Sequence, residues 1–129
     1  MKARLLIVDD EKDFLDVMAE RIRTRGMDVS TATSAEKALR MIRKESYDVV
    51  IMDLLMPEMD GFTALKLFKE TRPDLQIILL TANVREEEYI EAKRRGALDV
   101  IEKPADLNLL TQKIEAAKAR KVKQLTNDE

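Results

Sequence analysis

Short apolar runs alternate with segments of helical period along this chain, and the alternation restricts the fold more than any other feature. The clearest run is 49–53, in which four apolar residues lead directly into Asp53. A run this short, bounded by polar residues, is typical of a strand that is buried on both faces. Because strand and helix patterns alternate five times, the sequence predicts an α/β fold, a doubly wound parallel sheet with helices on both faces.

Apolar periodicity and turn residues predict where the elements begin and end. Apolar runs predict strands at 5–8, 29–32, 49–53, 76–80 and 99–102. Helical spacing predicts helices at 12–25, 35–42, 62–71 and 86–95, with a last helix from near 106 to 120. Thr33 to Glu36 and Asn83 to Glu86 have the capping-box pattern and predict two helix starts at Thr33 and Asn83.

The apolar stripes of the helices predict which faces are buried. The second helix should bury Leu39 with its alanines and Ile42, and the last should bury Leu107 with the apolar residues that follow at helical spacing. The fourth helix is thinly apolar, and Tyr89, Ile90 and Ala92 are its expected inner face.

The strands differ in apolar content, and this difference predicts their order in the sheet. The first, third and fourth strands are the most apolar and suit central positions, whereas the second and fifth suit the edges. The order 2-1-3-4-5, which is flavodoxin-like, satisfies this pattern and places the switch point between strands one and three. A chain of 129 residues fits one domain.

Composition excludes several classes of chemistry. The chain has no cysteine and no histidine, which excludes thiolate and imidazole metal sites, Ser-His catalysis and a phosphohistidine carrier. A formal net charge of -2 argues against direct nucleic-acid binding. We find no signal peptide or membrane-spanning segment and expect a cytoplasmic protein with no membrane partner.

Five polar side chains end a predicted strand or directly follow one: Asp9, Asp10, Asp53, Thr81 and Lys103. In the predicted sheet they meet at one edge, where three carboxylates repel one another and a single lysine offsets one charge. A divalent cation would offset the rest. Ligands that are all oxygen favour Mg²⁺, Mn²⁺ or Ca²⁺, and a site with a few carboxylates and room for water suits Mg²⁺.

This set of groups suits phosphoryl transfer. A metal ion and Lys103 would neutralise phosphoryl oxygens, and the hydroxyl of Thr81 would donate a hydrogen bond. An aspartate can act as the nucleophile and become an acyl phosphate. Asp53 is the central carboxylate and the expected acceptor, while Asp9 and Asp10 are the expected metal holders.

The motifs that carry these residues resemble the receiver domain of the response-regulator family of two-component signalling (CheY-like). The matching elements occur in family order between residues 4 and about 120: 6–10, 49–53, Met56-Pro57 with Gly61, 80–82, and Lys103-Pro104. The resemblance divides the chain into a receiver domain, 1–121, and a C-terminal tail or helix extension, 122–129.

The resemblance implies a role for each residue of the site. Asp53 would accept a phosphoryl group from the phosphohistidine of a sensor histidine kinase or phosphotransfer protein, and Thr81 and Lys103 would bind the phosphoryl oxygens. Asp10, Asp53 and the backbone carbonyl of Leu55 would bind Mg²⁺, with Asp9 acting through water. The Lys103-Pro104 bond would be cis. The chain would be no enzyme beyond its own phosphotransfer and slow autodephosphorylation.

Two positions depart from the family pattern. Val100 stands where an aromatic switch residue is common, and Ala105 follows Lys-Pro where Phe is common. Leu55, two residues after the acceptor, holds a position that varies in the family. The helix at 85–95, with strand 99–102 and the last helix, is the candidate signalling face for a target protein or a phosphorylation-dependent homodimer.

Other interpretations stay open at this stage. Asp9 and Asp10 alone could favour a helix N-terminus, Thr81 could be a strand-end residue and Lys103 a solvated edge lysine. The basic residues from Lys118 to Lys123 could lie at a solvated helix end and favour its dipole, or they could belong to a linker to an output domain. As whole-chain alternatives we weigh a phosphorylation-independent scaffold and a Mg²⁺-dependent phosphatase with an aspartyl-phosphate intermediate. The cognate kinase, the output and the oligomeric state stay open.

Overall fold

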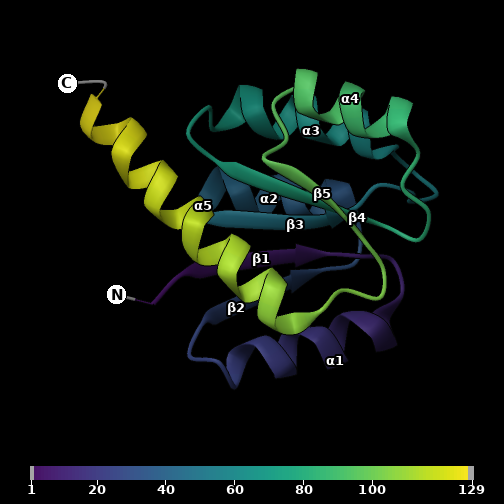
Figure 1. Cartoon of the computed structure of the whole chain (residues 1–129), viewed down its shortest axis with the longest axis horizontal. Helices are drawn as coiled ribbons and strands as arrows, with labels where there is room; N and C mark the ends of the chain where they lie inside the picture. Colours follow the sequence, from purple (N-terminus) through teal and green to yellow (C-terminus); the bar gives the residue numbers. More distant parts are fainter. Residues whose placement is uncertain (1, 128–129) are drawn as a thin grey trace.

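The described part of the chain, residues 2–127 of a computed structural model, forms five strands that alternate with five helices (Figure 1). The side chains are described up to residue 120. The elements are β1 (Arg4–Val8), α1 (Lys12–Arg23), β2 (Asp28–Ala32), α2 (Ala35–Lys44), β3 (Val49–Asp53), α3 (Gly61–Thr71), β4 (Gln76–Thr81), α4 (Glu86–Arg94), β5 (Asp99–Glu102) and α5 (Leu107–Asn127).

The strands form one parallel sheet in the order β2-β1-β3-β4-β5, which confirms the predicted fold class and strand order. Val8 at the end of β1 pairs with Met52 of β3, and Asp53 pairs with Leu80 of β4. The carboxyl ends of β1, β3 and β4 therefore lie at the same edge of the sheet. This is the edge at which open α/β sheets bind ligands.

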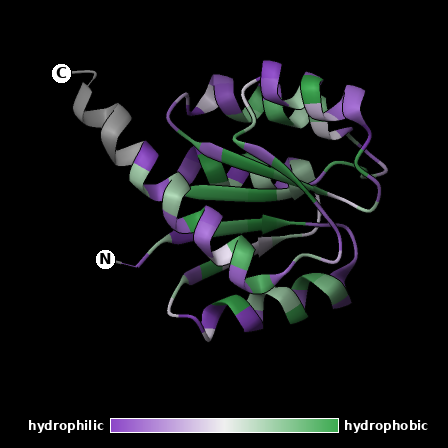
Figure 2. Cartoon of the chain, viewed as in Figure 1, coloured by the Kyte–Doolittle hydropathy of each residue, from purple (hydrophilic) through white to green (hydrophobic). Residues whose placement is uncertain are grey.

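Side chains alternate between the two faces of the sheet, as the period of a strand requires. Leu6 and Val8 pack into the core beneath α2, α3 and α4, whereas Leu5 and Ile7 pack into the core beneath α1 and α5. All five residues of β3 are buried. In Figure 2 the central strands are mostly hydrophobic, and the helices around them carry both hydrophilic and hydrophobic residues.

Two predicted helix caps are wrong. The N-cap of α2 is Ser34, whose Oγ accepts a hydrogen bond from the backbone N–H of Lys37 at 3.1 Å. Burial of the α2 stripe sets the helix to begin at Ala35, so the cap lies one residue after Thr33. The described N-cap of α4 is Arg85, which makes no side-chain capping bond, so Asn83 is not the cap. Three glutamates in the first turn of α4 interact favourably with its positive end instead.

The predicted inner face of α4 is confirmed for Ala92 and wrong for Tyr89 and Ile90. Within α4, whose residues are all described, Ala92 alone is buried, while Tyr89 and Ile90 are exposed. The small side chain of Ala92 lets the helix lie close to the core residues Ala97 and Val100, and this orientation turns the larger side chains outward. Leu39 of α2 and Leu107 of α5 are half-buried at the margins of the core rather than inside it.

Apart from the C-terminal end of α5, the remaining helix ends agree with the sequence to within about two residues, the usual uncertainty of a helix boundary. α1 ends at Arg23, and Gly26 follows in the left-handed region with φ of 85°. The predicted end of the last helix at residue 120 is wrong, because the backbone of α5 stays helical to Asn127. The division into 1–121 and 122–129 stays a prediction, and its last two residues lie outside the described part. Each described helix is too short or too polar to cross a membrane.

Candidate functional site

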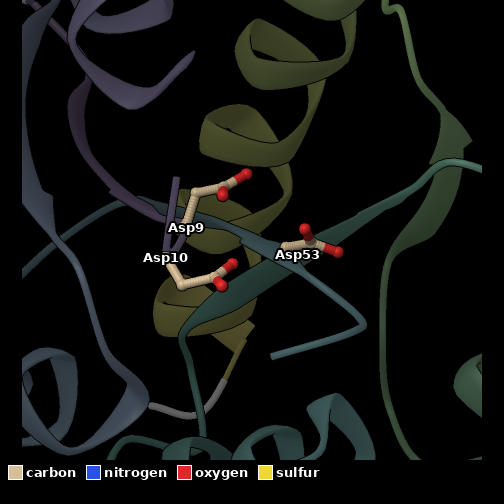
Figure 3. A group of neighbouring side chains, drawn as sticks. All are labelled: Asp9, Asp10 and Asp53. Atoms are coloured by element: carbon tan, nitrogen blue, oxygen red, sulfur yellow. The ribbon is translucent and has the colours of Figure 1, made fainter. Parts of the chain in front are cut away.

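Three carboxylates gather at the carboxyl edge of the sheet. Asp9 and Asp10 directly follow β1, and Asp53 is the last residue of the neighbouring strand β3. One oxygen from each carboxylate can be chosen so that all three lie within 4.8 Å of one another. Figure 3 shows the carboxylates of Asp9 and Asp10 extending from the end of β1 toward Asp53. The sequence predicts this cluster, and the pairing of β1 with β3 produces it.

Two of the three carboxylates are buried and each accepts two hydrogen bonds. Asp9 has 1% of its surface exposed and accepts from the backbone N–H of Glu11 at 2.9 Å and from Nζ of Lys103 at 2.8 Å. Asp53 has 9% exposed and accepts from the backbone N–H of Leu55 at 3.0 Å and from Nζ of Lys103 at 2.9 Å. These bonds fix the direction in which both carboxylates point.

Lys103 bridges the two buried acids. Burial by itself would lower the pKa of its ammonium, but the hydrogen bonds and the negative charges of Asp9 and Asp53 outweigh burial and raise the pKa above 10.5. The backbone N–H of Lys103 donates to the carbonyl of Thr81 at 2.8 Å, which anchors the lysine to the end of β4. The bond to Pro104 is cis, as expected.

Thr81 completes the set of five predicted side chains at this edge. It is the last residue of β4 and is buried. It lies one residue beyond Leu80, the partner of Asp53, so the register places it beside the central carboxylate. The structure therefore brings all five residues to the ends of β1, β3, β4 and β5.

The residues present fit a hard divalent cation. Three carboxylates carry three negative charges, and Lys103 offsets one of them. Within the part of the chain whose side chains are described, the exposed carboxylate of Asp10 has no hydrogen-bond or ion-pair partner. The site thus offers one free carboxylate beside two that are fixed by hydrogen bonds, and all of its ligand atoms are oxygen. Such ligands favour Mg²⁺ or Ca²⁺.

The loop after Asp53 is held against the strand end by Gly61. The backbone N–H of Gly61 donates to the carbonyl of Leu54 at 2.9 Å, and a Cβ at residue 61 would lie 2.8 Å from that carbonyl oxygen. Asp60 caps α3 by accepting from the backbone N–H of Thr63 at 3.0 Å, and this bond holds the pKa of Asp60 below its usual range. The hydrogen bond between Gly61 and Leu54 thus joins the two ends of the loop that carries Leu55.

Comparison with known proteins identifies the family. The model of the response regulator receiver domain matches residues 5–115. The chain belongs to this family. It is therefore a receiver domain of two-component systems.

Two curated relatives are regulators that are longer than this chain. It is 35% identical to the response regulator SaeR of Staphylococcus epidermidis over 96% of its own length and 57% of SaeR. It is 36% identical to the transcriptional regulatory protein ZraR of Salmonella typhimurium over 92% of its own length and 27% of ZraR. The receiver thus spans about half or less of these two relatives.

Solved structures share the fold over nearly the whole receiver. A CheY-like receiver domain protein from Methanospirillum hungatei is 27% identical, with a TM-score of 0.89 and coverage of 96% of this chain and 99% of that one. A beryllofluoride-activated NtrC4 receiver domain, solved as a dimer in solution, is 26% identical, with a TM-score of 0.86 and coverage of 92% and 98%.

The receiver site includes one residue that the sequence analysis did not assign to it. The ring of Phe14, on α1, lies under the ammonium of Lys103, with Nζ 4.4 Å from the ring centroid. The sequence signal was its place in the first turn of the helix that follows the acid pair. Phe14 lies on the same apolar side of α1 as Leu15 and Met18, so helical periodicity gives no reason to separate it from these core residues.

The structure shows the surroundings of the two departures from the family pattern, Val100 and Ala105, and of the variable position, Leu55. Val100 is buried and packs into the core beneath α2, α3 and α4. Ala105 is half-buried beside α1 and the start of α5. Leu55 has 65% of its surface exposed, so an apolar side chain stands in solvent two residues after Asp53.

Proposed function

We propose that this receiver is a phosphorylation-switched signalling module in which Asp53 accepts a phosphoryl group. The observation that carries the proposal is the placement of Asp53 between two further carboxylates and the ammonium of Lys103. The alternative roles of the single residues, as a helix N-terminus, a strand end or a solvated edge lysine, do not explain why all five side chains meet at one edge of the sheet. The donor we propose is the phosphohistidine of a sensor histidine kinase or of a phosphotransfer protein, because the chain has no histidine of its own.

In the proposed reaction a carboxylate oxygen of Asp53 attacks phosphorus. A P–O bond forms and the P–N bond to the imidazole of the donor breaks. The electron pair of the P–N bond stays on the imidazole nitrogen, which takes up a proton from solvent. The product is an acyl phosphate on Asp53. Lys103 and the hydroxyl of Thr81 would stabilise the phosphoryl oxygens through a charge-assisted and a neutral hydrogen bond.

We propose Mg²⁺ as the cofactor. The expected ligands are Asp10, Asp53 and the backbone carbonyl of Leu55, with Asp9 acting through water. When bound, the ion would neutralise negative charge on the phosphoryl oxygens. The hydrogen bonds donated by the backbone N–H groups of Glu11 and Leu55 keep Asp9 and Asp53 oriented toward the shared space.

We infer that the output passes through the face formed by α4, β5 and α5. α4 is held by one buried side chain, and Tyr89 and Ile90 stand in solvent on it. An element with few apolar contacts is easily biased between arrangements. The beryllofluoride-activated NtrC4 receiver domain is a dimer, which supports a phosphorylation-dependent homodimer of this chain. A target protein is the other partner that we propose for this face. Phosphorylation should change amide exchange in α4, and unchanged exchange would count against this output.

The test of the acceptor is incubation with acetyl phosphate and Mg²⁺, followed by intact mass. We expect wild-type protein to gain one phosphoryl group, with no gain in Asp53→Asn or when a chelator removes Mg²⁺. Asp53→Asn is nearly isosteric, so an unchanged far-ultraviolet circular dichroism spectrum serves as its control for folding. An equal mass gain in Asp53→Asn, or no gain in wild type, would contradict the proposal.

Two alternatives make different predictions. A phosphorylation-independent scaffold predicts that Asp53→Asn signals normally. A Mg²⁺-dependent phosphatase predicts turnover of p-nitrophenyl phosphate. Such enzymes usually carry a second aspartate two residues after the nucleophile as general acid, and Leu55 holds that position here, so we expect no turnover.

A further inference from the structure

The ammonium of Lys103 is enclosed by three groups. Two are the carboxylates of Asp9 and Asp53, at 2.8 and 2.9 Å, and the third is the ring of Phe14 at 4.4 Å from the centroid. The side chain of Lys103 has 16% of its surface exposed, so the aromatic ring replaces much of the water that would otherwise solvate the ammonium. A cation over an aromatic face is attracted by the quadrupole of the ring.

The three contacts respond differently to the reaction proposed for this site. The hydrogen bonds that Lys103 donates to Asp9 and Asp53 depend on the free negative charge of these carboxylates. That charge changes when Asp53 becomes an acyl phosphate, and a metal ion competes for it. The ring of Phe14 is neutral and makes no bond to the phosphoryl group, so its attraction for the ammonium is the same before and after transfer. Phe14 is therefore the contact that can hold Lys103 in place throughout the cycle.

The position of Phe14 suits this task. It lies on α1, four residues after Asp10, and is half-buried against the core beneath α1 and α5. Beside it runs a groove of about 170 Å³ lined by residues of α1 and of the segment after Lys103. Core packing fixes the ring from one side, and Lys103 covers part of its face.

We propose that Phe14 is a positioning residue that holds the ammonium of Lys103 at the carboxyl edge of the sheet, ready to bind the transferred phosphoryl group. The inference rests on the proposed function of the site. The alternative is a plain structural role, in which Phe14 contributes only apolar packing and any bulky apolar residue serves equally well.

The experiment compares Phe14→Leu, which keeps an apolar side chain, with Phe14→Tyr, which keeps the aromatic face. Each variant reacts with acetyl phosphate and Mg²⁺, and intact mass gives the rate of phosphorylation. We expect Phe14→Leu to react about two- to fivefold more slowly than wild type, the range for a cation–π contact at a partly exposed site. Phe14→Tyr should react at nearly the wild-type rate. Val17→Ala, an exposed position one turn along α1, is the matched control and should not change the rate.

A double-mutant cycle separates positioning from packing. In a Lys103→Gln background, replacing Phe14 by Leu should not slow the reaction further, because the ammonium it holds is gone. Equal slowing in both backgrounds, or a wild-type rate in Phe14→Leu, would overturn the inference.

Nuclear magnetic resonance tests the contact independently of phosphorylation. The methylene protons next to the ammonium of Lys103 should be shifted upfield by the ring in wild type and in Phe14→Tyr, but not in Phe14→Leu. If wild type takes up no phosphoryl group, the proposed function fails while this shift still reports the contact. If wild type reacts but lacks the upfield shift, the proposed function stands and the role of Phe14 fails.

Discussion

Helices α1 and α4 are attached to the same sheet in different ways. α1 buries Leu15, Met18, Ala19 and Ile22, and its first turn presents Phe14 to the site. α4 buries one alanine. The region that would receive the phosphoryl group is thus firmly packed, and the region that would report it is held by little apolar contact. A receiver needs both, because a fixed site can bias only an element whose alternative arrangements differ little in free energy.

The largest effect should come from breaking the packing of α1. Leu15→Ala should lower the free energy of unfolding by about 2–5 kcal/mol, the range for removing a buried leucine. Ile90→Ala on α4 should change it by less than about 0.5 kcal/mol, because half of this side chain is already in solvent. Urea unfolding of both variants measures the difference. Similar losses would show that α4 is as firmly attached as α1.

Removing the cation between the acids should be the next largest effect. Lys103→Met leaves the buried carboxylates of Asp9 and Asp53 close together without an ammonium, and we expect a loss of about 2–4 kcal/mol at neutral pH. Added Mg²⁺ should restore part of this loss. Stability in the variant equal to that of wild type would mean that solvent already compensates the acids.

The same variant gives a pH dependence with a definite sign. The pKa of Lys103 is raised in the folded state, so its contribution to stability is fully present below the unfolded value of 10.5 and is lost as the pH rises through the folded pKa. The difference in unfolding free energy between wild type and Lys103→Met should therefore be constant at neutral pH and shrink above about pH 10.5. Subtraction of the two curves removes the titration of other lysines and tyrosines.

Much of the site followed from the sequence because it depends on strand ends. Asp9, Asp53 and Thr81 end or directly follow apolar runs, and parallel pairing brings such residues to one edge whatever the helices do.

Helix orientation was less predictable. Both Thr33 and Ser34 can cap a helix, and burial of the α2 stripe decides between them. Helical spacing predicts that Ile90 faces the core, but α4 packs against the sheet through Ala92 and the side chain of Ile90 points to solvent. The contact of Phe14 with Lys103 was not predicted, because helical periodicity does not distinguish a ring that only packs against the core from one that also contacts an ammonium group.

A smaller effect on stability is expected at the loop that closes the site. In Gly61→Ala the new Cβ would lie 2.8 Å from backbone atoms of Leu54, which cannot move without shifting the end of β3. We expect a loss of about 1–3 kcal/mol, as for overpacking. Gly26→Ala is a useful control, because that glycine has open space around it and any loss there reports its positive φ alone. If both variants lose the same amount, the close approach at residue 61 does not constrain the loop.

The smallest effect on the fold, and one confined to rates, should come from Leu55. Its side chain is largely exposed beside Asp53 and is apolar, so it cannot orient a water molecule for attack on the acyl phosphate. Leu55→Asn supplies an amide that can, and the phosphorylated variant should lose its phosphoryl group faster than wild type with no measurable change in unfolding. Decay of the phosphorylated mass after removal of acetyl phosphate measures the rate, and Leu55→Val separates the effect of polarity from that of size. Equal or faster loss in wild type would show that water reaches the acyl phosphate without help from residue 55, and that the lifetime of the signal is set by the buried groups rather than by the exposed loop.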